Sequence, residues 1–241
     1  MGMFDSSIFR LRNSLSQLKR KVTGDYKLSF SQCGEDILVE HVFMVMGIKK
    51  IRYLDIGAHH PSFLSNTKLF YLKGHRGVCI EADPSLAPAF AAERPEDVCL
   101  NVGVGLEDGE ADFYVMSPAT LNTFSKQEAE RYESYGKHRI EDVVKVPLYT
   151  VNRIMQEQFD GAPNYVSLDV EGMDLAILQS FDFKRFRPQV FCIETLTYVD
   201  DKSERKLNEI IEFMQVQGYF VYADTYINSI FVDSETWKNR Q

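Results

Sequence analysis

Acidic or amide side chains end three consecutive apolar runs in the first half of the sequence. Asp55 lies near the end of the first run, Glu81 ends the second run 26 positions later (81 − 55), and Asn101 follows the third. At a strand end, a carboxylate such as Glu81 can accept hydrogen bonds from both ribose hydroxyls, and an amide can pair with an adenine edge. The ordered set predicts a site for an adenosine-containing cofactor, with Ala82 and Val102 beside it.

The loop after the first run distinguishes two classes of such cofactors. It reads DIGAHHPSFLS and contains one glycine, Gly57. Dinucleotides need the pattern G-x-G-x-x-G, whose glycines bring pyrophosphate onto a helix N-terminus. Gly57, followed by Ala58, instead suits the methionine tail of S-adenosylmethionine, because glycine permits a tight turn and a close backbone approach. The alternatives are an NAD-dependent sugar-modifying Rossmann enzyme and a non-catalytic cofactor-binding scaffold, in which the acids only cap helices.

A second group of ionisable side chains is expected at the same edge of the sheet. Its members are Asp169, Glu171, Glu194, His59 and His60. Methyl transfer to a hydroxyl needs help in removing the hydroxyl proton. In one hypothesis Asp169 or a histidine is the general base and Glu171 orients it or the acceptor. In the other, Asp169 and Glu194 hold Mg²⁺ or another divalent cation that lowers the hydroxyl pKa. A structural reading places the acids at a helix N-terminus and the histidines on backbone groups.

The elements that must position these residues alternate between strands and helices. The first five apolar runs are nearly continuous, which is typical of strands buried on both faces of a mainly parallel sheet. The predicted strands are Ile51–Gly57, Val78–Asp83, Val98–Val104, Tyr165–Gly172, Val190–Thr195, Tyr219–Asp224 and Ile227–Asp233. Only Thr225 and Tyr226 separate the last two, so these must pair as an antiparallel hairpin. The pattern predicts an α/β fold, a Rossmann-like doubly wound seven-stranded sheet of the class I methyltransferase type.

A leader precedes the predicted domain. Residues 1–27 are locally basic, and their apolar residues recur at helical spacing, at Ile8, Leu11, Leu15 and Leu18. This pattern predicts a basic amphipathic helix that lies on the domain or makes a peripheral contact with an anionic membrane or a partner. Residues 28–241 are predicted to form a single methyltransferase domain.

An insertion interrupts the predicted domain at about residues 109–151. Its sequence predicts a strand, a loop with a short helix and a returning strand. A long connection in a compact domain is often a lid or binding loop. We therefore expect Asn122, Thr123 and Phe124 to face the acceptor.

The composition excludes some functions. The balance of 27 Lys and Arg against 35 Asp and Glu gives a net charge of −8, which is a poor match for nucleic acid. Four cysteines, Cys33, Cys79, Cys99 and Cys192, form no C-x-x-C pair and predict a reduced, cytoplasmic protein. No apolar run is long enough to cross a bilayer. The expected partner is therefore a small-molecule or glycan acceptor.

Several segments together resemble the FkbM family of methyltransferases. They are SQCGED (Ser31–Asp36), YLDIGAHHPSFLSNT (Tyr53–Thr67), GVCIEADP (Gly77–Pro84), LNTFS (Leu121–Ser125) and SLDVEGMDLAIL (Ser167–Leu178). The resemblance runs from about Leu28 to Phe186 and implies an S-adenosylmethionine-dependent O-methyltransferase that acts on small molecules or on sugars of glycans. It also adds Ser31 and Gln32 to the expected cofactor-binding residues.

Overall fold

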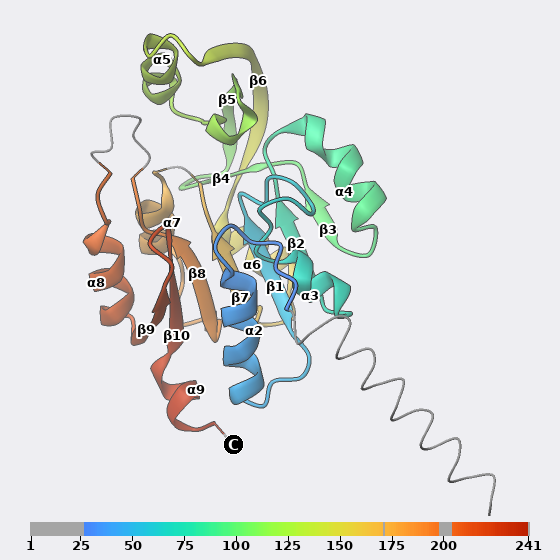
Figure 1. Cartoon of the computed structure of the whole chain (residues 1–241), viewed down its shortest axis with the longest axis vertical. Helices are drawn as coiled ribbons and strands as arrows, with labels where there is room; N and C mark the ends of the chain where they lie inside the picture. The colour runs from blue at the N-terminus through green and yellow to red at the C-terminus, as the bar shows by residue number, and fades with distance from the viewer. Residues whose placement is uncertain (1–26, 171, 198–203, 241) are drawn as a thin grey trace, which may run out of the picture.

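A computed structural model describes residues 27–170, 172–197 and 204–240, and its main element is a seven-stranded sheet (Figure 1). The strand order is β3-β2-β1-β7-β8-β10-β9. The strands are β1 (Arg52–Ile56), β2 (Arg76–Ile80), β3 (Val98–Leu100), β7 (Tyr165–Leu168), β8 (Val190–Glu194), β9 (Tyr219–Asp224) and β10 (Asn228–Asp233). The first five pair in parallel with one another. This arrangement confirms the predicted α/β class and the mainly parallel seven-stranded sheet.

The two C-terminal strands reverse the chain direction within this sheet. β10 pairs antiparallel with both β8 and β9. The turn between β9 and β10 is too short for a crossover helix, because a parallel connection needs about a dozen residues. The predicted antiparallel hairpin is therefore confirmed.

Alternate residues of β1 contribute to two different cores. Leu54 and Ile56 pack into one hydrophobic cluster, whereas Tyr53 packs into the other. Successive side chains of a strand point to opposite faces, so a central strand must be apolar on both. Helices cover the two faces: α6 (Val151–Gln158), α7 (Asp174–Ser180) and α8 (Asn208–Val216) contribute to the first cluster, and α2 (Glu35–Val45), α3 (Lys68–Leu72) and α4 (Ala87–Glu93) to the second.

The insertion forms a small sheet of its own. Its strand order is β4-β6-β5, with β4 (Gly103–Gly105), β5 (Gly109–Ser117) and β6 (Arg139–Thr150). The helix α5 (Lys126–Ser134) lies between β5 and β6 in the chain, and the small sheet and α5 lie together at one end of the large sheet (Figure 1).

The predicted strand Val98–Val104 is in fact two strands in different sheets. Leu100 pairs with Ile80 in the large sheet, and Gly103 pairs with Leu148 in the small one. Gly103 is required at this junction, because a Cβ atom there would lie 2.4 Å from the ring of Phe124. The sequence run is continuous in hydrophobicity and therefore hides the change of sheet.

The predicted amphipathic leader lies outside the described residues, except for Lys27. Within the part of the chain that the structure describes, none of the helices has the length and apolar character needed to span a membrane.

Candidate functional site

A cavity of about 570 Å³ lies where the carboxyl ends of β1, β2, β7 and β8 meet the insertion. Ligands of open α/β sheets bind at this edge. Thirteen of the residues singled out from the sequence line it: Gln32, Asp55, Gly57, Ala58, His59, Glu81, Ala82, Val102, Asn122, Thr123, Phe124, Asp169 and Glu194. Glu171 is outside the described residues. The cavity thus lies at the edge of the sheet where the sequence analysis expected a site.

Gly57 lets the chain turn tightly where β1 ends. Its φ angle is +76°, and a Cβ atom at this position would lie 1.8 Å from the backbone oxygen of Asp169. The amide groups of Gly57 and Ala58 both donate to the carbonyl oxygen of Ile80, at 3.1 and 2.9 Å. A glycine is therefore required both by the backbone conformation and by the close approach of the loop after β7.

Glu81 is held by backbone groups of two loops. Its Oε2 atom accepts from the His59 amide at 2.6 Å, and its Oε1 atom accepts from the Asp83 amide at 2.7 Å. The side chain is buried, and this burial raises the pKa of Glu81 to about 7. Each carboxylate oxygen has a second lone pair, so the oriented carboxylate can accept two further hydrogen bonds from a vicinal diol.

Asp55 is connected to a buried arginine through Thr67. The Thr67 hydroxyl donates to Asp55 Oδ2 at 2.5 Å and accepts from Arg94 Nη2 at 2.9 Å. Burial raises the pKa of Asp55, while the positive charge of Arg94 and the Thr67 hydrogen bond oppose that rise. Arg94 and Thr67 thus form a chain of hydrogen bonds that stabilises the negative charge of Asp55, whose carboxylate lines the cavity.

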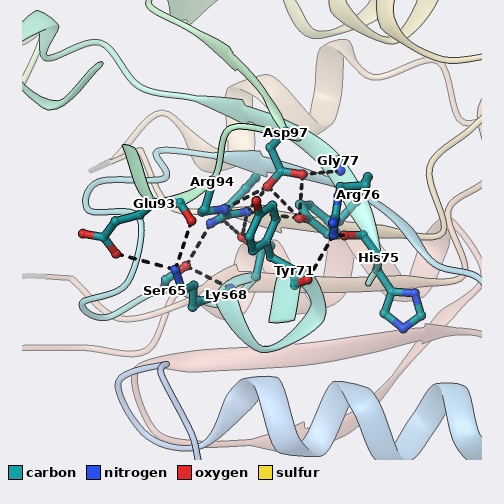
Figure 2. A network of polar contacts seen from close by, with 12 residues as sticks. Ser65, Lys68, Tyr71, His75, Arg76, Gly77, Glu93, Arg94 and Asp97 are labelled. Carbon is teal, nitrogen blue, oxygen red and sulfur yellow. Dashed lines mark hydrogen bonds and ion pairs between the residues drawn. The ribbon is translucent and has the colours of Figure 1, made fainter. Parts of the chain in front are cut away.

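Arg94 itself is fully buried at the centre of a polar network, which Figure 2 shows from close by. Its Nε atom donates to Asp97 Oδ2 at 2.8 Å, and its Nη1 atom donates to Ser65 at 3.3 Å. Asp97 also accepts from the hydroxyl of Tyr53 and from the amide of Gly77. A buried charge needs both a charged partner and hydrogen bonds. Asp97 and the other members of this network therefore compensate the positive charge of Arg94, and one guanidinium nitrogen remains directed at Thr67.

Asp169 and Glu194 form a carboxyl pair at the ends of β7 and β8. Burial and the nearby carboxylates of Asp174 and Asp55 raise the pKa of Asp169 to about 7, while a side-chain hydrogen bond with Glu194 lowers it. Asp169 is therefore suited to take up a proton near neutral pH.

The loop after Asp169 is held by a carboxylate that the sequence analysis did not single out. Asp174 accepts from the amides of Val170 and Gly172 at 3.2 and 3.3 Å. Burial raises the pKa of Asp174 to about 6. Asp174 stands directly before the apolar run Leu175–Leu178, so an acidic residue at the start of a predicted helix was the signal available in the sequence.

The structure gives no support to the predicted divalent-cation site. Within residues 27–170, 172–197 and 204–240, no group of three or more His, Cys, Asp or Glu is arranged to hold a metal ion. Asp169 and Glu194 are two carboxyl groups joined by a hydrogen bond, and Mg²⁺ can be bound through one or two carboxylates with water as its other ligands. Metal binding by this pair stays a prediction.

Three residues expected at the site have other roles in the structure. Asn101 does not line the cavity, and its amide donates to the carbonyl oxygens of Glu81 and Ala82 at 2.8 and 3.0 Å. Ser31 donates to Asp36 at 3.0 Å, and His60 accepts from the amides of residues 62 and 63. These side chains satisfy nearby polar groups, which a sequence pattern does not distinguish from ligand binding.

The insertion covers the end of the cavity that Glu81 and Val102 line. Asn122 donates to Asp83, directly after β2, at 3.0 Å. The ring of Phe124 packs against Phe113, with 4.8 Å between ring centroids, and against Gly103. Asn122, Thr123 and Phe124 line the cavity, and these contacts place the segment over the ends of β2 and β4. That the segment faces the acceptor stays a prediction.

Other polar lining residues come from segments that the sequence analysis did not assign to the site. Asn66 donates to Ser167 at 3.1 Å, and Asn228 donates to the buried Glu35 at 3.1 Å. Thr197 and Glu204 complete the wall beyond β8. Asn66 lies in a segment that resembles the family, and Asn228 is a polar residue at the start of an apolar run. Neither feature is enough to identify a cavity-lining residue from one sequence.

Comparison with known proteins identifies a family. A family model described as the methyltransferase FkbM domain matches residues 55–221. No curated protein matches the chain. Solved structures that resemble it include a 1,6-didemethyltoxoflavin-N1-methyltransferase from Burkholderia thailandensis with bound S-adenosylhomocysteine (11% identity, 97% of this chain and 92% of that chain, TM-score 0.41). Another is an O-methyltransferase from Bacillus cereus in complex with S-adenosylhomocysteine (11% identity, 91% and 89%, TM-score 0.43). Because the family match includes the strand ends that line the cavity, the chain belongs to the FkbM methyltransferase family.

Proposed function

We propose that the protein is an S-adenosylmethionine-dependent O-methyltransferase, and that its acceptor is a hydroxyl of a sugar, a glycan or a related small molecule. The observation that carries this proposal is the hydrogen-bonded pair of Asp169 and Glu194 at the edge of the cavity. A neutral aliphatic hydroxyl is a weak nucleophile, so its methylation needs a base at the reacting oxygen. An amine needs less assistance, and the pair therefore favours oxygen.

The other side chains of the cavity divide into a nucleoside end and a methionine end. Glu81 presents two carboxylate oxygens for the ribose diol, and Val102 and Phe124 offer apolar surface for the adenine ring. The turn at Gly57 and the carboxylate of Asp55 are available for the amino acid part of the cofactor. The side chains of Ser31 and Asn101, which we expected to bind the cofactor, hydrogen-bond to protein groups in the structure. Ser31 donates to Asp36, and Asn101 donates to the carbonyl oxygens of Glu81 and Ala82.

The bound cofactor supplies an electrophilic methyl group on a sulfonium. The carboxyl pair, in its doubly ionised form, accepts the hydroxyl proton, which Asp169 and Glu194 then share. Bound S-adenosylmethionine would supply its methyl group to the acceptor oxygen with cleavage of the carbon–sulfur bond, and S-adenosylhomocysteine would be the product. Because burial raises the pKa of Asp169, the pair is a stronger base than an ordinary carboxylate, and general-base catalysis is most effective when the pKa of the base is near the working pH.

The far wall of the cavity suits a hydroxylated acceptor. Asn66, Asn228, Thr197 and Glu204 offer amide, hydroxyl and carboxylate groups on this wall. Asn228 is buried and fixed by Glu35, so its orientation is set before an acceptor binds. Oriented polar groups of this kind position a ligand and give specificity.

Calorimetry with S-adenosylhomocysteine, with NAD as the control ligand, tests the cofactor class. Saturable binding of S-adenosylhomocysteine alone is expected. The protein is then supplied with S-adenosylmethionine and a panel of glycosides and amines, with and without a chelator, and S-adenosylhomocysteine formation is measured. Turnover of hydroxylated acceptors that a chelator leaves unchanged supports the proposal. Binding of NAD alone, or turnover of amines only, contradicts it.

A further inference from the structure

We infer that the acceptor end of the cavity selects hydroxylated acceptors that carry no phosphate or other anionic group, so that methylation follows glycosyl transfer rather than preceding it. This inference rests on the proposed function and specifies the substrate class of the same site. It starts from the distribution of charge around the cavity.

Apart from one histidine, the ionisable side chains that line the cavity are all carboxyl groups in the described part of the chain. They are Asp55, Glu81, Asp169, Glu194 and Glu204, and neither a lysine nor an arginine lies among the described lining residues. The one histidine in the lining is His59, and burial lowers its pKa. It is therefore neutral at pH 7, and no described side chain of the lining offers a positive charge to an acceptor.

The cofactor accounts for only part of this negative charge. S-adenosylmethionine carries an ammonium, a sulfonium and a carboxylate, a net charge of +1. Asp55 and Glu81 lie at the ends of β1 and β2, where the proposed cofactor would bind. Glu194 and Glu204 lie beyond β7, on the wall proposed for the acceptor, and face whatever enters there.

Two described cations that follow Glu204 in the chain, and the arginine behind Asp55, are already paired. Lys206 lies 2.8 Å from Asp224 and donates to the carbonyl oxygen of Tyr226 at 2.8 Å. Arg205 lies 4.0 Å from Glu209 and points to α8. Arg94, the buried arginine behind Asp55, is fully enclosed and ion-paired with Asp97. Recruiting any of these to a phosphate would break an existing ion pair.

The structural features that usually bind phosphate are also missing or occupied here. Phosphate sites use arginine forks or the free amides at the start of a helix. Before α7 the amides of Val170 and Gly172 are bonded to Asp174, so a carboxylate already holds the position an anion would take. A nucleoside-diphosphate sugar would place two phosphate charges against this acidic wall, and like charges repel strongly in a partly buried site. A neutral glycoside meets only hydrogen-bonding groups.

The order of reactions follows from this chemistry. A sugar loses its nucleoside diphosphate when a glycosyl transfer reaction attaches it to an acceptor. Where the acceptor is such a sugar, a methyltransferase that rejects anionic acceptors acts after the nucleoside diphosphate has left. For a sugar acceptor, glycosyl transfer is therefore the class of reaction that supplies the substrate of this enzyme.

Turnover of two matched series tests the inference with the full-length protein. The first series contains methyl glycosides of common hexoses and 6-deoxyhexoses, and the second contains nucleoside diphosphate derivatives of the same sugars. We expect kcat/KM for the neutral series to exceed that for the anionic series by about tenfold or more. In parallel, calorimetry with uridine diphosphate and the protein loaded with S-adenosylhomocysteine is expected to show no saturable binding.

Charge variants show whether the acidic wall is the cause. Glu204→Gln is expected to reduce the ratio of kcat/KM for the neutral series to kcat/KM for the anionic series by about threefold to tenfold. Glu209→Gln on α8, outside the cavity lining, is expected to leave this ratio unchanged. Equal turnover of both series, saturable binding of uridine diphosphate, or an unchanged preference in Glu204→Gln would overturn the inference while leaving the proposed function intact. Turnover of neither series by protein that binds S-adenosylhomocysteine contradicts the proposed function, and the inference with it.

Discussion

The Thr67 hydroxyl lies 2.5 Å from Asp55 Oδ2 and connects this cavity-lining carboxylate to Arg94. We predict that Thr67→Val, which keeps the side-chain shape, lowers the free energy of unfolding by about 1–3 kcal/mol and weakens S-adenosylhomocysteine binding by about tenfold. The reason is that Asp55 loses a donor and Arg94 loses an acceptor, both in a buried setting. Denaturant unfolding and calorimetry measure the two effects.

Thr67→Ser is the matched control, since it retains the hydroxyl. Wild-type stability and affinity in the valine variant would show that the chain from Arg94 to Asp55 contributes nothing to the site.

Binding of the cofactor product should depend on pH through Glu81. Burial raises the pKa of this carboxyl to about 7, and a protonated carboxyl has one fewer acceptor oxygen for the ribose diol. The affinity for S-adenosylhomocysteine is therefore expected to be full above pH 7 and to fall as the pH decreases, by about tenfold per unit at most. Calorimetry between pH 5 and 8.5 gives this profile.

Substitutions identify the titrating group. Glu81→Gln should bind weakly with a flatter profile, and Glu81→Ala should not bind at all, whereas the exposed Glu110→Gln should retain the wild-type profile. A steep profile that persists in Glu81→Gln assigns the titration to another residue.

The carboxyl pair is expected to affect turnover much more than binding. Asp169→Ala should bind S-adenosylhomocysteine within about threefold of the wild type but lose turnover by roughly 10²–10⁴-fold, the contribution of a general base. In the wild type, kcat should rise with pH through neutrality, since the pKa of Asp169 is raised and only the doubly ionised pair can accept a proton.

A double-mutant cycle tests whether the two residues act as one unit. Asp169→Asn combined with Glu194→Gln should cost little more than the larger single effect, because effects within a unit are not additive. Asp160→Asn, which changes an exposed aspartate outside the cavity, is the control. Wild-type turnover in Asp169→Ala would remove this residue from the mechanism.

Alanine substitution at two glycines with similar backbone conformations distinguishes the cost of a positive φ angle from the cost of a steric clash. Gly47 has a φ angle of +71° and open space around its missing Cβ atom, whereas Gly57 has a φ angle of +76° and the Asp169 carbonyl oxygen 1.8 Å away. Gly47→Ala should lower the free energy of unfolding by about 1–2 kcal/mol, and Gly57→Ala by about 3 kcal/mol or more. Denaturant unfolding of both variants measures this. Equal losses would mean that the loop after β7 moves aside at no cost.

Local patterns in the sequence were sufficient for most of the fold. The alternation of buried runs with helical segments, and the short turn at Thr225 and Tyr226, depend only on neighbouring residues, so the mainly parallel sheet and its C-terminal hairpin could be predicted. The rule that parallel strands present their carboxyl ends at one edge then located Asp55, Glu81 and Asp169 at one cavity.

Only the tertiary structure decided how individual polar groups are used. Asn101 could have paired with a ligand, but its amide bonds to backbone carbonyls that the fold brings within 3.0 Å. The run Val98–Val104 is equally apolar along its length, and it divides between two sheets because Gly103 meets Leu148 and Phe124.

The sequence by itself therefore determined the family, the order of the elements and the edge of the sheet that carries the site, because these follow from local periodicity and short motifs. The tertiary structure decided that Asp169 meets Glu194, that Thr67 connects Asp55 to Arg94, and that the insertion lies over the end of β2. Each of these contacts joins residues far apart in the chain or on different elements. The direction and partner of a polar side chain depend on which of several satisfiable hydrogen bonds the packing brings within reach.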